Sequence, residues 1–408
     1  MNDFLSHGLP DCELQQLLYE ELKKQNETIS LIASENLAST RVRYVQSTVL
    51  TNKYAEGYPG KRYYAGCEFV DQIEQLCQQR ACTLFQAKYA NVQPHSGSQA
   101  NFAVFMSLLE PGDTILGMDL ASGGHLTHGS KVNMSGKFFN TVTYGLDDKE
   151  CIDMNEVDRL AKLYKPKLII AGTSAYSRII DWSLFHKVAK ENNALLLVDM
   201  AHVSGLIAAG RFPNPLPHAD VVTSTTHKTL KGPRGGIILT NNEEIYKKIN
   251  KGVFPGSQGG PLMHIIAAKA MCFHDAMSEQ FRSYIDQVLL NAKVMCEQLS
   301  HKFQIVSETT ETHLFVLKLN NCTGLEAEKW LADAGIMVNK NMIPNDVQTP
   351  IKTSGIRIGT PLCTARGFGT RESVKVAEYI EKLIESKGQD SIMIKQEIEE
   401  LCKKFPVV

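Results

Sequence analysis

Short apolar runs that alternate with amphipathic stretches constrain the fold of this chain most strongly. Residues 168–171 and 194–198 are apolar throughout, and residues 182–192 between them have helical spacing. A strand that is apolar on both faces must be covered on both faces, and strands joined through helices run parallel. The same alternation predicts strands at residues 89–92, 114–118, 220–225 and 236–239 and a helix at residues 99–109. We therefore predict an α/β fold with a mostly parallel sheet flanked by helices.

The length of the chain predicts more than one domain. It has 408 residues, whereas a single hydrophobic core stops growing near about 250–300 residues. Residues 263–303 form a long helical stretch, either two helices or one broken helix, and we place a boundary within it near residue 280. Short strands at 313–319, 336–339 and 356–359 then mix with helices at 325–334 and 372–386, which predicts a smaller α+β domain. The predicted division is an N-terminal arm and interface loop at 1–57, a large domain at 58–279 and a small domain at 280–408.

The N-terminal region combines one helix with a long irregular segment. Leu14, Leu17, Leu18 and Leu22 share one face of a predicted helix at residues 11–26, with Asp11 as its N-cap. Residues 35–64 are rich in Asn, Gly, Pro and Tyr and show little periodicity, before helical spacing resumes at residues 70–84. Loops of that length inside a compact domain are usually functional.

Charge and cysteine usage exclude several classes of function. The formal net charge is -1 without a long basic or acidic block, so we expect neither a dedicated nucleic-acid partner nor a membrane-surface partner. No apolar run approaches the ~20 residues of a membrane span. The first 16 residues lack a basic segment followed by an apolar core, so we expect no secretory signal. The ten cysteines form no Cys-x-x-Cys pair, which predicts reduced thiols and a cytoplasmic location.

A lysine at the end of a predicted strand is the first candidate for chemistry. The β-branched run at residues 221–226, which includes Thr225, leads into His227 and Lys228, and a Gly/Pro-rich turn follows at residues 232–236. An amine that loses its proton through desolvation can attack a carbonyl carbon. Such a string also occurs in ordinary surface loops, so it needs partners elsewhere in the chain.

Two further strand ends offer such partners. Asp199 ends the apolar run 195–198 and could hold a pyridine nitrogen protonated, or could cap the segment that follows. Ser96, Gly97 and Ser98 lie between a strand and a helix, where backbone N–H groups and hydroxyls can bind a phosphate. Ser-Gly-Ser is also common in simple turns.

His125 and Arg357 complete the set. His125 lies in a predicted strand-end loop and could stack on a planar cofactor. With His128 it could bind a metal, but no carboxylate or cysteine accompanies the pair at useful spacing, so we expect no metal. Arg357, on an alternating strand, could clamp a carboxylate or form a surface ion pair. Lysine, aspartate, phosphate turn and distal arginine together fit a pyridoxal-phosphate enzyme acting on an amino acid.

Eight strings then resemble one family, the serine hydroxymethyltransferases. They lie at residues 31–36, 52–64, 95–101, 123–129, 198–202, 223–229, 254–260 and 357–361. The resemblance spans residues ~10 to ~385. It implies the fold-type-I pyridoxal-phosphate architecture and a homodimer whose active sites are shared across the interface. Ser204, Lys231, Leu362 and Cys363 depart from the usual pattern without removing a role-bearing residue.

The resemblance also implies cofactor contacts. Lys228 would form the internal aldimine, Asp199 would pair with the pyridine nitrogen, and His125 would stack on the ring. Ser174 and His202 would contact the ring hydroxyl. The phosphate would be bound by Ser96, Gly97 and Ser98, with Gly260 from the partner subunit.

Substrate contacts follow in the same way. Arg357 and Ser34 would hold the substrate carboxylate. Glu56 would be the acid/base group near the serine hydroxyl, with Tyr54 and Tyr64 beside it, and Thr225 and His227 are counted with the catalytic residues. Tetrahydrofolate would lie along Leu120, Gly124, Leu126 and Asn341.

The implied reaction is the reversible transfer of the serine hydroxymethyl carbon to tetrahydrofolate, giving glycine and 5,10-methylenetetrahydrofolate. Two alternatives stay open at this point. One is a pyridoxal-phosphate enzyme for threonine-like β-hydroxy amino acids or α-methylserine, and the other is a catalytically silent scaffold protein. The presence of Lys228 and Asp199 argues against the silent protein. The Tyr54–Tyr64 loop and the Leu120/Leu126 pair argue against a folate-free enzyme.

Overall fold

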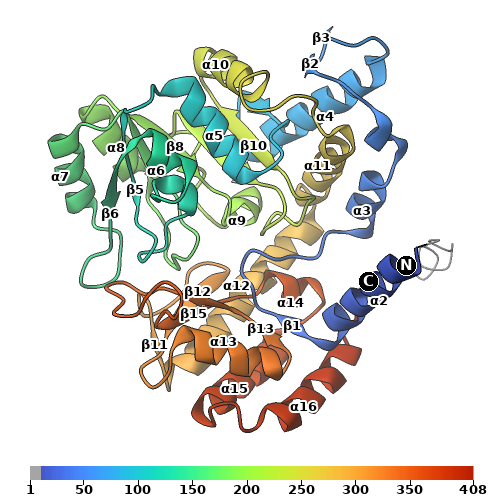
Figure 1. The fold of residues 1–408 in the computed structure, drawn as a ribbon, viewed down its shortest axis with the longest axis vertical. Coiled ribbons are helices and arrows are strands. Elements are labelled where there is room, and N and C mark those ends of the chain that lie inside the picture. The colour runs from blue at the N-terminus through green and yellow to red at the C-terminus, as the bar shows by residue number, and fades with distance from the viewer. Residues whose placement is uncertain (1–10, 408) are drawn as a thin grey trace.

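A seven-stranded sheet forms the centre of the larger part of the molecule. The computed structural model describes residues 11–407 (Figure 1). The strands are β4 (Tyr89–Asn91), β5 (Thr114–Met118), β6 (Asn140–Tyr144), β7 (Leu168–Ala171), β8 (Leu195–Asp199), β9 (Val221–Thr225) and β10 (Gly236–Thr240). Their order is β4-β10-β9-β8-β7-β5-β6, and only the pairs that involve β10 are antiparallel. The predicted α/β class with a mostly parallel sheet is confirmed.

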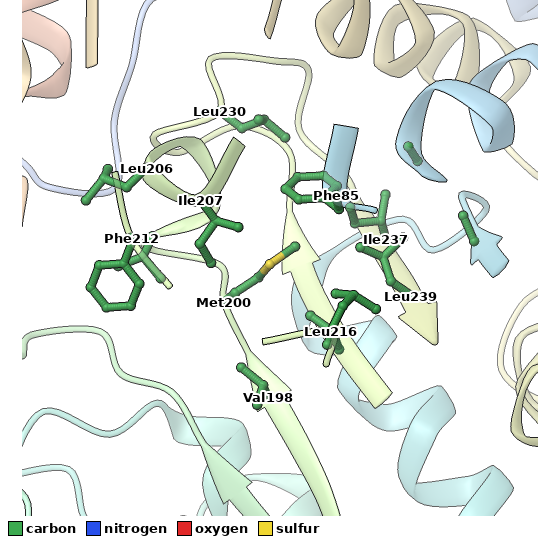
Figure 2. Close-up of a cluster of buried hydrophobic side chains, with 14 of the residues drawn as sticks. Phe85, Val198, Met200, Leu206, Ile207, Phe212, Leu216, Leu230, Ile237 and Leu239 are labelled. Carbon is green, nitrogen blue, oxygen red and sulfur yellow. The ribbon is translucent and has the colours of Figure 1, made fainter. Parts of the chain in front are cut away.

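Helices cover both faces of this sheet. They are α4 (Glu68–Phe85), α5 (Gly97–Leu108), α6 (Met134–Phe138), α7 (Met154–Tyr164), α8 (Trp182–Glu191), α9 (Ser204–Ala208), α10 (Glu243–Val253) and α11 (Met263–Ala276), with a 3-10 turn η2 (Leu126–His128). Val198 and Val222 belong to the hydrophobic cluster on one face, part of which is drawn in Figure 2, whereas Leu197 and Val221 belong to the cluster on the other. Successive strand residues point to opposite faces, so two covered faces require the continuous apolar runs seen in the sequence.

A second, antiparallel sheet organises the C-terminal part, which lies below the large sheet in Figure 1. Its strands β11 (Gln304–Ile305), β12 (Leu314–Lys318), β14 (Asn339–Asn341) and β15 (Gly355–Gly359) follow the order β11-β12-β15-β14. Helices α12 (Glu279–Ser300), α13 (Gly324–Asp333), α14 (Pro361–Ala365), α15 (Thr370–Glu385) and α16 (Ser391–Lys403) complete it. The prediction of a single strand at residues 336–339 is wrong. β13 (Ile336–Met337) pairs with β1 (Ile29–Ser30), whereas Asn339 is the first residue of β14, which pairs with β15.

The long helical stretch forms two helices, as one of the two predicted alternatives. The second of them, α12, connects the two hydrophobic cores. Its first turns place Phe281 and Ile285 in the core of the large sheet, and its last turns place Met295 and Leu299 in the core of the small sheet. The division near residue 280 stays a prediction.

The N-terminal region is more ordered than its composition indicates. Helix α2 (Cys12–Glu27) begins as predicted, since the Asp11 carboxylate accepts a hydrogen bond from the Leu14 N–H at 3.0 Å. Residues 35–64 contain α3 (Thr40–Gln46), the 3-10 turn η1 (Val49–Asn52) and a hairpin of β2 (Gly57–Tyr58) with β3 (Lys61–Arg62). The hairpin is fixed by Arg62, which is bonded to Asp71 at 2.8 Å and to the buried Glu74 at 2.7 Å.

Within residues 11–407, no helix is both long and apolar enough to cross a membrane. The expectation that the chain begins without a secretory signal concerns in part residues 1–10, which lie outside the described residues.

Candidate active site

The carboxyl ends of the parallel strands bring most predicted residues together. β8 ends at Asp199, β9 ends at Thr225 just before Lys228, and β15 of the small sheet contributes Arg357. They surround a cavity of about 440 Å³. Ligands of parallel α/β sheets bind at this edge. The cavity is lined by Ser34, Glu35, Ser96, Gly97, Ser98, His125, His128, Thr173, Ser174, Asp199, Ala201, His202, Thr225, His227, Lys228, Arg234 and Arg357.

The surroundings of Lys228 favour the neutral, nucleophilic form of its amine. Its side chain is buried, and burial lowers the pKa of its amine to about 8, although the charge of Asp199 opposes that shift. Asn36 fixes the backbone by donating from Nδ2 to the Lys228 carbonyl at 2.8 Å. A substantial share of the amine is therefore neutral near physiological pH, which a lysine in water never achieves.

The turn that follows Lys228 is closed by short-range bonds. The Gly232 N–H donates to the Thr226 carbonyl at 2.8 Å, and the Thr226 hydroxyl donates to the Pro233 carbonyl at 2.6 Å. A Cβ atom on Gly232 would lie 2.5 Å from Cys272 Sγ, so a larger residue cannot occupy this position without a shift. These contacts fix the turn that follows Lys228.

Lys269, on α11, reinforces the same region from inside the protein. Its ammonium is fully buried and donates to the carbonyls of Val92, Pro94 and Gly236 at 2.7, 3.0 and 2.8 Å. Burial lowers the pKa of Lys269 to about 8. The three hydrogen bonds join the end of the Lys228 turn to the segment that leads into Ser96.

Asp199 is kept ionised by its neighbours. Its Oδ2 accepts from Asn101 Nδ2 at 2.9 Å and lies 3.1 Å from His128 Nε2, and its Oδ1 accepts from the Ala201 N–H at 3.1 Å. Burial opposes ionisation, but the hydrogen bond and electrostatic effect of His128, together with the contributions of His125 and Asn101, hold the pKa of Asp199 well below its usual range. Through the Ala201 N–H, Asp199 also caps the segment that follows β8, as the alternative role predicted, whereas helix α9 begins later with Val203 at its N-cap position.

His125 lies beside this carboxylate as a neutral ring. Burial lowers its pKa to about 4, and its Nδ1 lies 2.8 Å from the Thr127 hydroxyl. In the sequence, no carboxylate lies close enough to His125 and His128 to complete a metal site. The fold brings Asp199 to them, and the ligand atoms of the three residues lie within 4.8 Å of one another. Asn101 and His128 already occupy Asp199 Oδ2 with hydrogen bonds. A carboxylate held in this way is suited to pair with a cationic ring.

The N-terminus of α5 opens into the cavity. The Ser96 hydroxyl caps the helix by accepting from the Gln99 N–H at 3.1 Å. A Cβ atom on Gly97 would lie 2.6 Å from Thr225 Cγ2, so a glycine is needed for β9 to approach the helix so closely. Helix N-termini bind anions through their free N–H groups. Ser98, on the first turn, also lines the cavity.

Arg357 reaches the cavity from the small sheet. Its Nη1 donates to the Ser174 carbonyl at 2.6 Å and its Nε donates to Asn339 Oδ1 at 3.1 Å. Burial lowers the pKa of the guanidinium to about 10, which still leaves it charged at neutral pH. These two bonds use two of its five N–H donors, so the group is oriented while donors remain for an anion.

Four predicted residues form a separate cluster. Tyr54 donates to Glu56 at 3.3 Å and Tyr64 donates to the other oxygen of Glu56 at 3.4 Å, with the two rings edge to face at 5.0 Å. A Cβ atom on Gly260 would lie 3.1 Å from the Tyr54 ring. Among the described residues, none of these four lines the Lys228 cavity of the same chain.

The residues predicted to bind the folate also lie outside the cavity lining. Leu120 and Leu126 are exposed, and Asn341 is half-buried on β14 with its amide bonded to the Met342 carbonyl at 2.6 Å. Gly124 has no room for a side chain, since its Cβ would lie 2.1 Å from the Met118 carbonyl oxygen. The structure therefore leaves two uncovered apolar side chains near η2.

Sequence reasoning missed several residues of the site. Asn101 donates to Asp199, and its Oδ1 accepts from the Thr223 hydroxyl at 2.6 Å, which fixes the orientation of the amide. Glu35 and Arg234 line the cavity without having been predicted. Asn101 does belong to the string at residues 95–101 and projects from α5, so helical spacing from Ser98 would have placed it on the cavity side of that helix.

Two residues that line the cavity also have buried polar atoms without a hydrogen-bond partner among the described residues. Thr225 Oγ1 and His227 Nδ1 are buried without a hydrogen bond in the described residues. Burial lowers the pKa of His227 to about 3, so its ring is neutral. Unpaired buried polar atoms are costly, and a polar ligand in the cavity is the simplest way to satisfy them. The residues thus fit a cofactor with an aldehyde, a ring nitrogen and a phosphate.

Fold and site together define a pyridoxal-phosphate-dependent enzyme of fold type I. A sequence model of the serine hydroxymethyltransferase family matches residues 9–380. The chain belongs to this family. It is therefore a pyridoxal-phosphate-dependent one-carbon transferase whose substrates are serine, glycine and tetrahydrofolate.

Curated relatives named serine hydroxymethyltransferase match nearly the whole chain. One from Acinetobacter baumannii (strain AYE) is 56% identical over 404 residues, which cover 97% of this chain and 97% of the relative. One from Psychrobacter sp. (strain PRwf-1) is 54% identical over 403 residues, or 97% of this chain and 96% of the relative. One from Halorhodospira halophila is 54% identical over 403 residues, with 97% of both chains covered.

Proposed function

We propose that this chain reversibly transfers the hydroxymethyl carbon of L-serine to tetrahydrofolate, with Lys228 as the residue that attaches the cofactor. The observation that supports this most directly is the buried Lys228, with its lowered pKa, in one cavity with the ionised Asp199 and the oriented Arg357. When bound, pyridoxal phosphate supplies an electron sink that stabilises negative charge at the α-carbon of an amino acid.

The residues around the cavity divide the work of holding this cofactor. Lys228 would attach it covalently, and the ionised Asp199 would keep its ring nitrogen protonated. The N-terminus of α5, with Ser96, Gly97 and Ser98, would bind the phosphate. The neutral ring of His125 would cover one face of the cofactor, and Ser174 and His202 would face its ring oxygen.

Binding of the amino acid follows from charge. Arg357 is the cavity residue best suited to a carboxylate, because a planar guanidinium can donate two parallel hydrogen bonds. Ser34 lines the same cavity and would add a further donor. Thr225 and His227 flank the lysine with unpaired polar atoms, so they would contact the bound ligand.

Completion of the site requires a second copy of the chain. Glu56, Tyr54, Tyr64 and Gly260 do not line the Lys228 cavity of their own chain, and they form a compact group with a carboxylate at its centre. The apolar face of α2 is also uncovered, with Leu14, Leu17 and Leu18 exposed. A homodimer in which each chain supplies Glu56 to the cavity of the other would account for both features.

In that dimer, Glu56 would move the proton between the serine hydroxyl and the folate. A carboxylate flanked by two tyrosine hydroxyls is well placed for such a transfer. The uncovered side chains of Leu120 and Leu126, with Gly124 between them and Asn341, would contact the folate.

Cleavage of serine to glycine, with and without tetrahydrofolate, tests the proposal. The protein loaded with pyridoxal phosphate should form glycine far faster when tetrahydrofolate is present, and Glu56→Gln should lose most of that stimulation. Cleavage of allo-threonine serves as the control, because it requires no folate and should persist in Glu56→Gln. If tetrahydrofolate failed to stimulate the wild-type protein, the proposal would be wrong.

A cytoplasmic location is part of the proposal. All ten cysteines lie among the described residues and are free thiols, most of them buried or half-buried. Such thiols persist in a reducing compartment.

A further inference from the structure

A histidine of the small domain is hydrogen-bonded to a histidine of the cofactor cavity. His202 follows β8 and lines the cavity with Lys228 and Asp199. His313 immediately precedes β12 of the small sheet and is completely buried. The two rings meet through His202 Nδ1 and His313 Nε2, which lie 3.3 Å apart. This contact joins the two sheets directly behind the cavity wall.

The geometry of the pair is that of a hydrogen bond in the ring planes. The ring centres are 5.5 Å apart and the planes differ by 22°. The nitrogen–nitrogen distance accounts for most of the separation between the centres, so the rings lie nearly end to end rather than face to face. One proton therefore lies between the two nitrogens, and it belongs to one ring or the other.

Both rings are neutral. Burial holds the pKa of His202 well below its usual range, and the charges of Lys228 and Arg357 act in the same direction. Burial likewise lowers the pKa of His313 to about 3. A neutral imidazole has one N–H and one bare nitrogen, so the position of the shared proton fixes the state of all four ring nitrogens.

The unpaired nitrogen of His313 decides between the two arrangements. His313 Nδ1 is buried and has no hydrogen-bond partner in residues 11–407. If the shared proton belonged to His202, the proton of His313 would lie on this Nδ1 and leave a buried N–H without an acceptor. Orphaned N–H groups are the rarer defect in protein interiors, where under-satisfied acceptors are tolerated somewhat better.

The nearby cations act in the opposite sense. Lys228 and Arg357 favour a bare nitrogen of His202 on the cavity side. Neither of them is hydrogen-bonded to His202 in the described part of the chain, however, and Arg357 is occupied with Ser174 and Asn339. The cost of an unpaired N–H at His313 Nδ1 therefore outweighs the electrostatic effect of the two cations on His202.

We propose that His313 is a positioning residue whose Nε2–H donates to His202 Nδ1 and thereby fixes His202 Nε2 as an N–H donor toward the cavity. Under the proposed function, on which this consequence rests, the donor faces the ring oxygen of pyridoxal phosphate and stabilises its anionic form. The small domain thus determines which group the large domain presents to the cofactor, without itself touching the cofactor.

Nitrogen-15 NMR of the full-length protein labelled with [15N]histidine tests the proton positions directly. Long-range proton–nitrogen correlations distinguish the two neutral tautomers, and the signals are assigned from His202→Gln and His313→Gln. Both rings should be Nε2–H tautomers, with and without pyridoxal phosphate. An Nδ1–H tautomer at either ring would overturn the proposal, even if the enzyme were fully active.

Two substitutions separate positioning from packing. His313→Gln keeps an amide N–H near the position of Nε2, whereas His313→Leu keeps volume without a donor. We expect the dissociation constant for pyridoxal phosphate to rise about tenfold in His313→Leu and to stay within about threefold of wild type in His313→Gln. His202 should keep its Nε2–H tautomer in His313→Gln and lose this fixed tautomer in His313→Leu.

Equal losses of cofactor affinity in the two variants would contradict the positioning role. If His313→Leu did not fold, the wild-type tautomers and His313→Gln would still decide the matter. If the tautomers were as expected but wild-type protein bound no pyridoxal phosphate, the proposed function would fail and the histidine pair would stand.

Discussion

Lys228 combines deep burial with a nearby carboxylate, and this combination makes its reactivity depend on pH. Its pKa is lowered from 10.5 to about 8, mainly by burial. Only the neutral amine attacks an aldehyde, so the rate of covalent attachment of pyridoxal phosphate to the cofactor-free protein should rise with pH and level off above about 8. Rapid-mixing absorbance at a series of pH values measures this rate.

Asp199→Asn provides the matched control for that profile. The charge of Asp199 raises the pKa of Lys228 against the effect of burial, so its removal should move the midpoint to lower pH. A rate that kept rising toward 10.5 in the wild-type protein would show that the amine behaves like an ordinary exposed lysine.

Arg357 gives a second prediction at the scale of single residues. Arg357→Lys keeps the charge but loses the forked geometry and the bond to Ser174, so KM for serine should rise by about 10- to 100-fold with a smaller change in kcat. Arg366→Lys is the control, because Arg366 is equally buried but binds backbone carbonyls of Asn26 and Phe405. It should lower stability and leave KM unchanged. A KM that responds equally to both substitutions would remove Arg357 from the substrate site.

Single residues were predictable where their role depends on a strand end. Lys228 and Asp199 follow apolar runs, and parallel strands bring such ends to one edge. The partners of Asp199 were not predictable in the same way, because Asn101 and His128 reach it across 98 and 71 residues of sequence. The contact of His313 with His202 was not predictable, because it depends on how the two sheets meet.

At the scale of elements, two helix caps allow stability and function to be separated. Ser96 caps α5 beside the cavity, and Thr323 caps α13 in the C-terminal part with a similar bond to the Glu326 N–H. Replacing either by alanine should cost about 1 kcal/mol of stability. Only Ser96→Ala should also weaken the binding of pyridoxal phosphate.

Denaturant unfolding of the cofactor-free proteins and cofactor titration measure these two effects. Equal cofactor affinity in the two variants would mean that the Ser96 hydroxyl serves the helix alone.

Elements were predictable from sequence in proportion to their burial. β7, β8 and β9 are covered on both faces, and their apolar or β-branched runs predicted them within one residue. β6 was not predicted, because it is an edge strand in which only Tyr144 is buried. The β2–β3 hairpin within residues 35–64 was missed because it depends on the ion pairs of Arg62 with α4 rather than on periodicity.

At the scale of the whole molecule, the separation of Glu56 from the Lys228 cavity predicts complementation between inactive chains. Lys228→Ala and Glu56→Gln should each be inactive in folate-dependent cleavage of serine. After unfolding and refolding of an equal mixture, half of the molecules of the proposed homodimer would be hybrids with one intact site, so activity should recover to about one quarter of wild type. Wild-type protein taken through the same unfolding and refolding serves as the reference for the yield of active dimers. Failure of the mixture to recover activity would place Glu56 and Lys228 in the same chain's site, or in none.

Transfer of the serine hydroxymethyl carbon tests the central claim most directly. Protein loaded with pyridoxal phosphate is given [3-13C]serine and tetrahydrofolate, and carbon-13 NMR follows the label. The label should appear in the methylene group of 5,10-methylenetetrahydrofolate, with one glycine formed for each labelled carbon transferred. Lys228→Ala should transfer the label far more slowly than the wild-type protein. Serine left intact, or glycine formed at the same rate when tetrahydrofolate is omitted, would contradict the account.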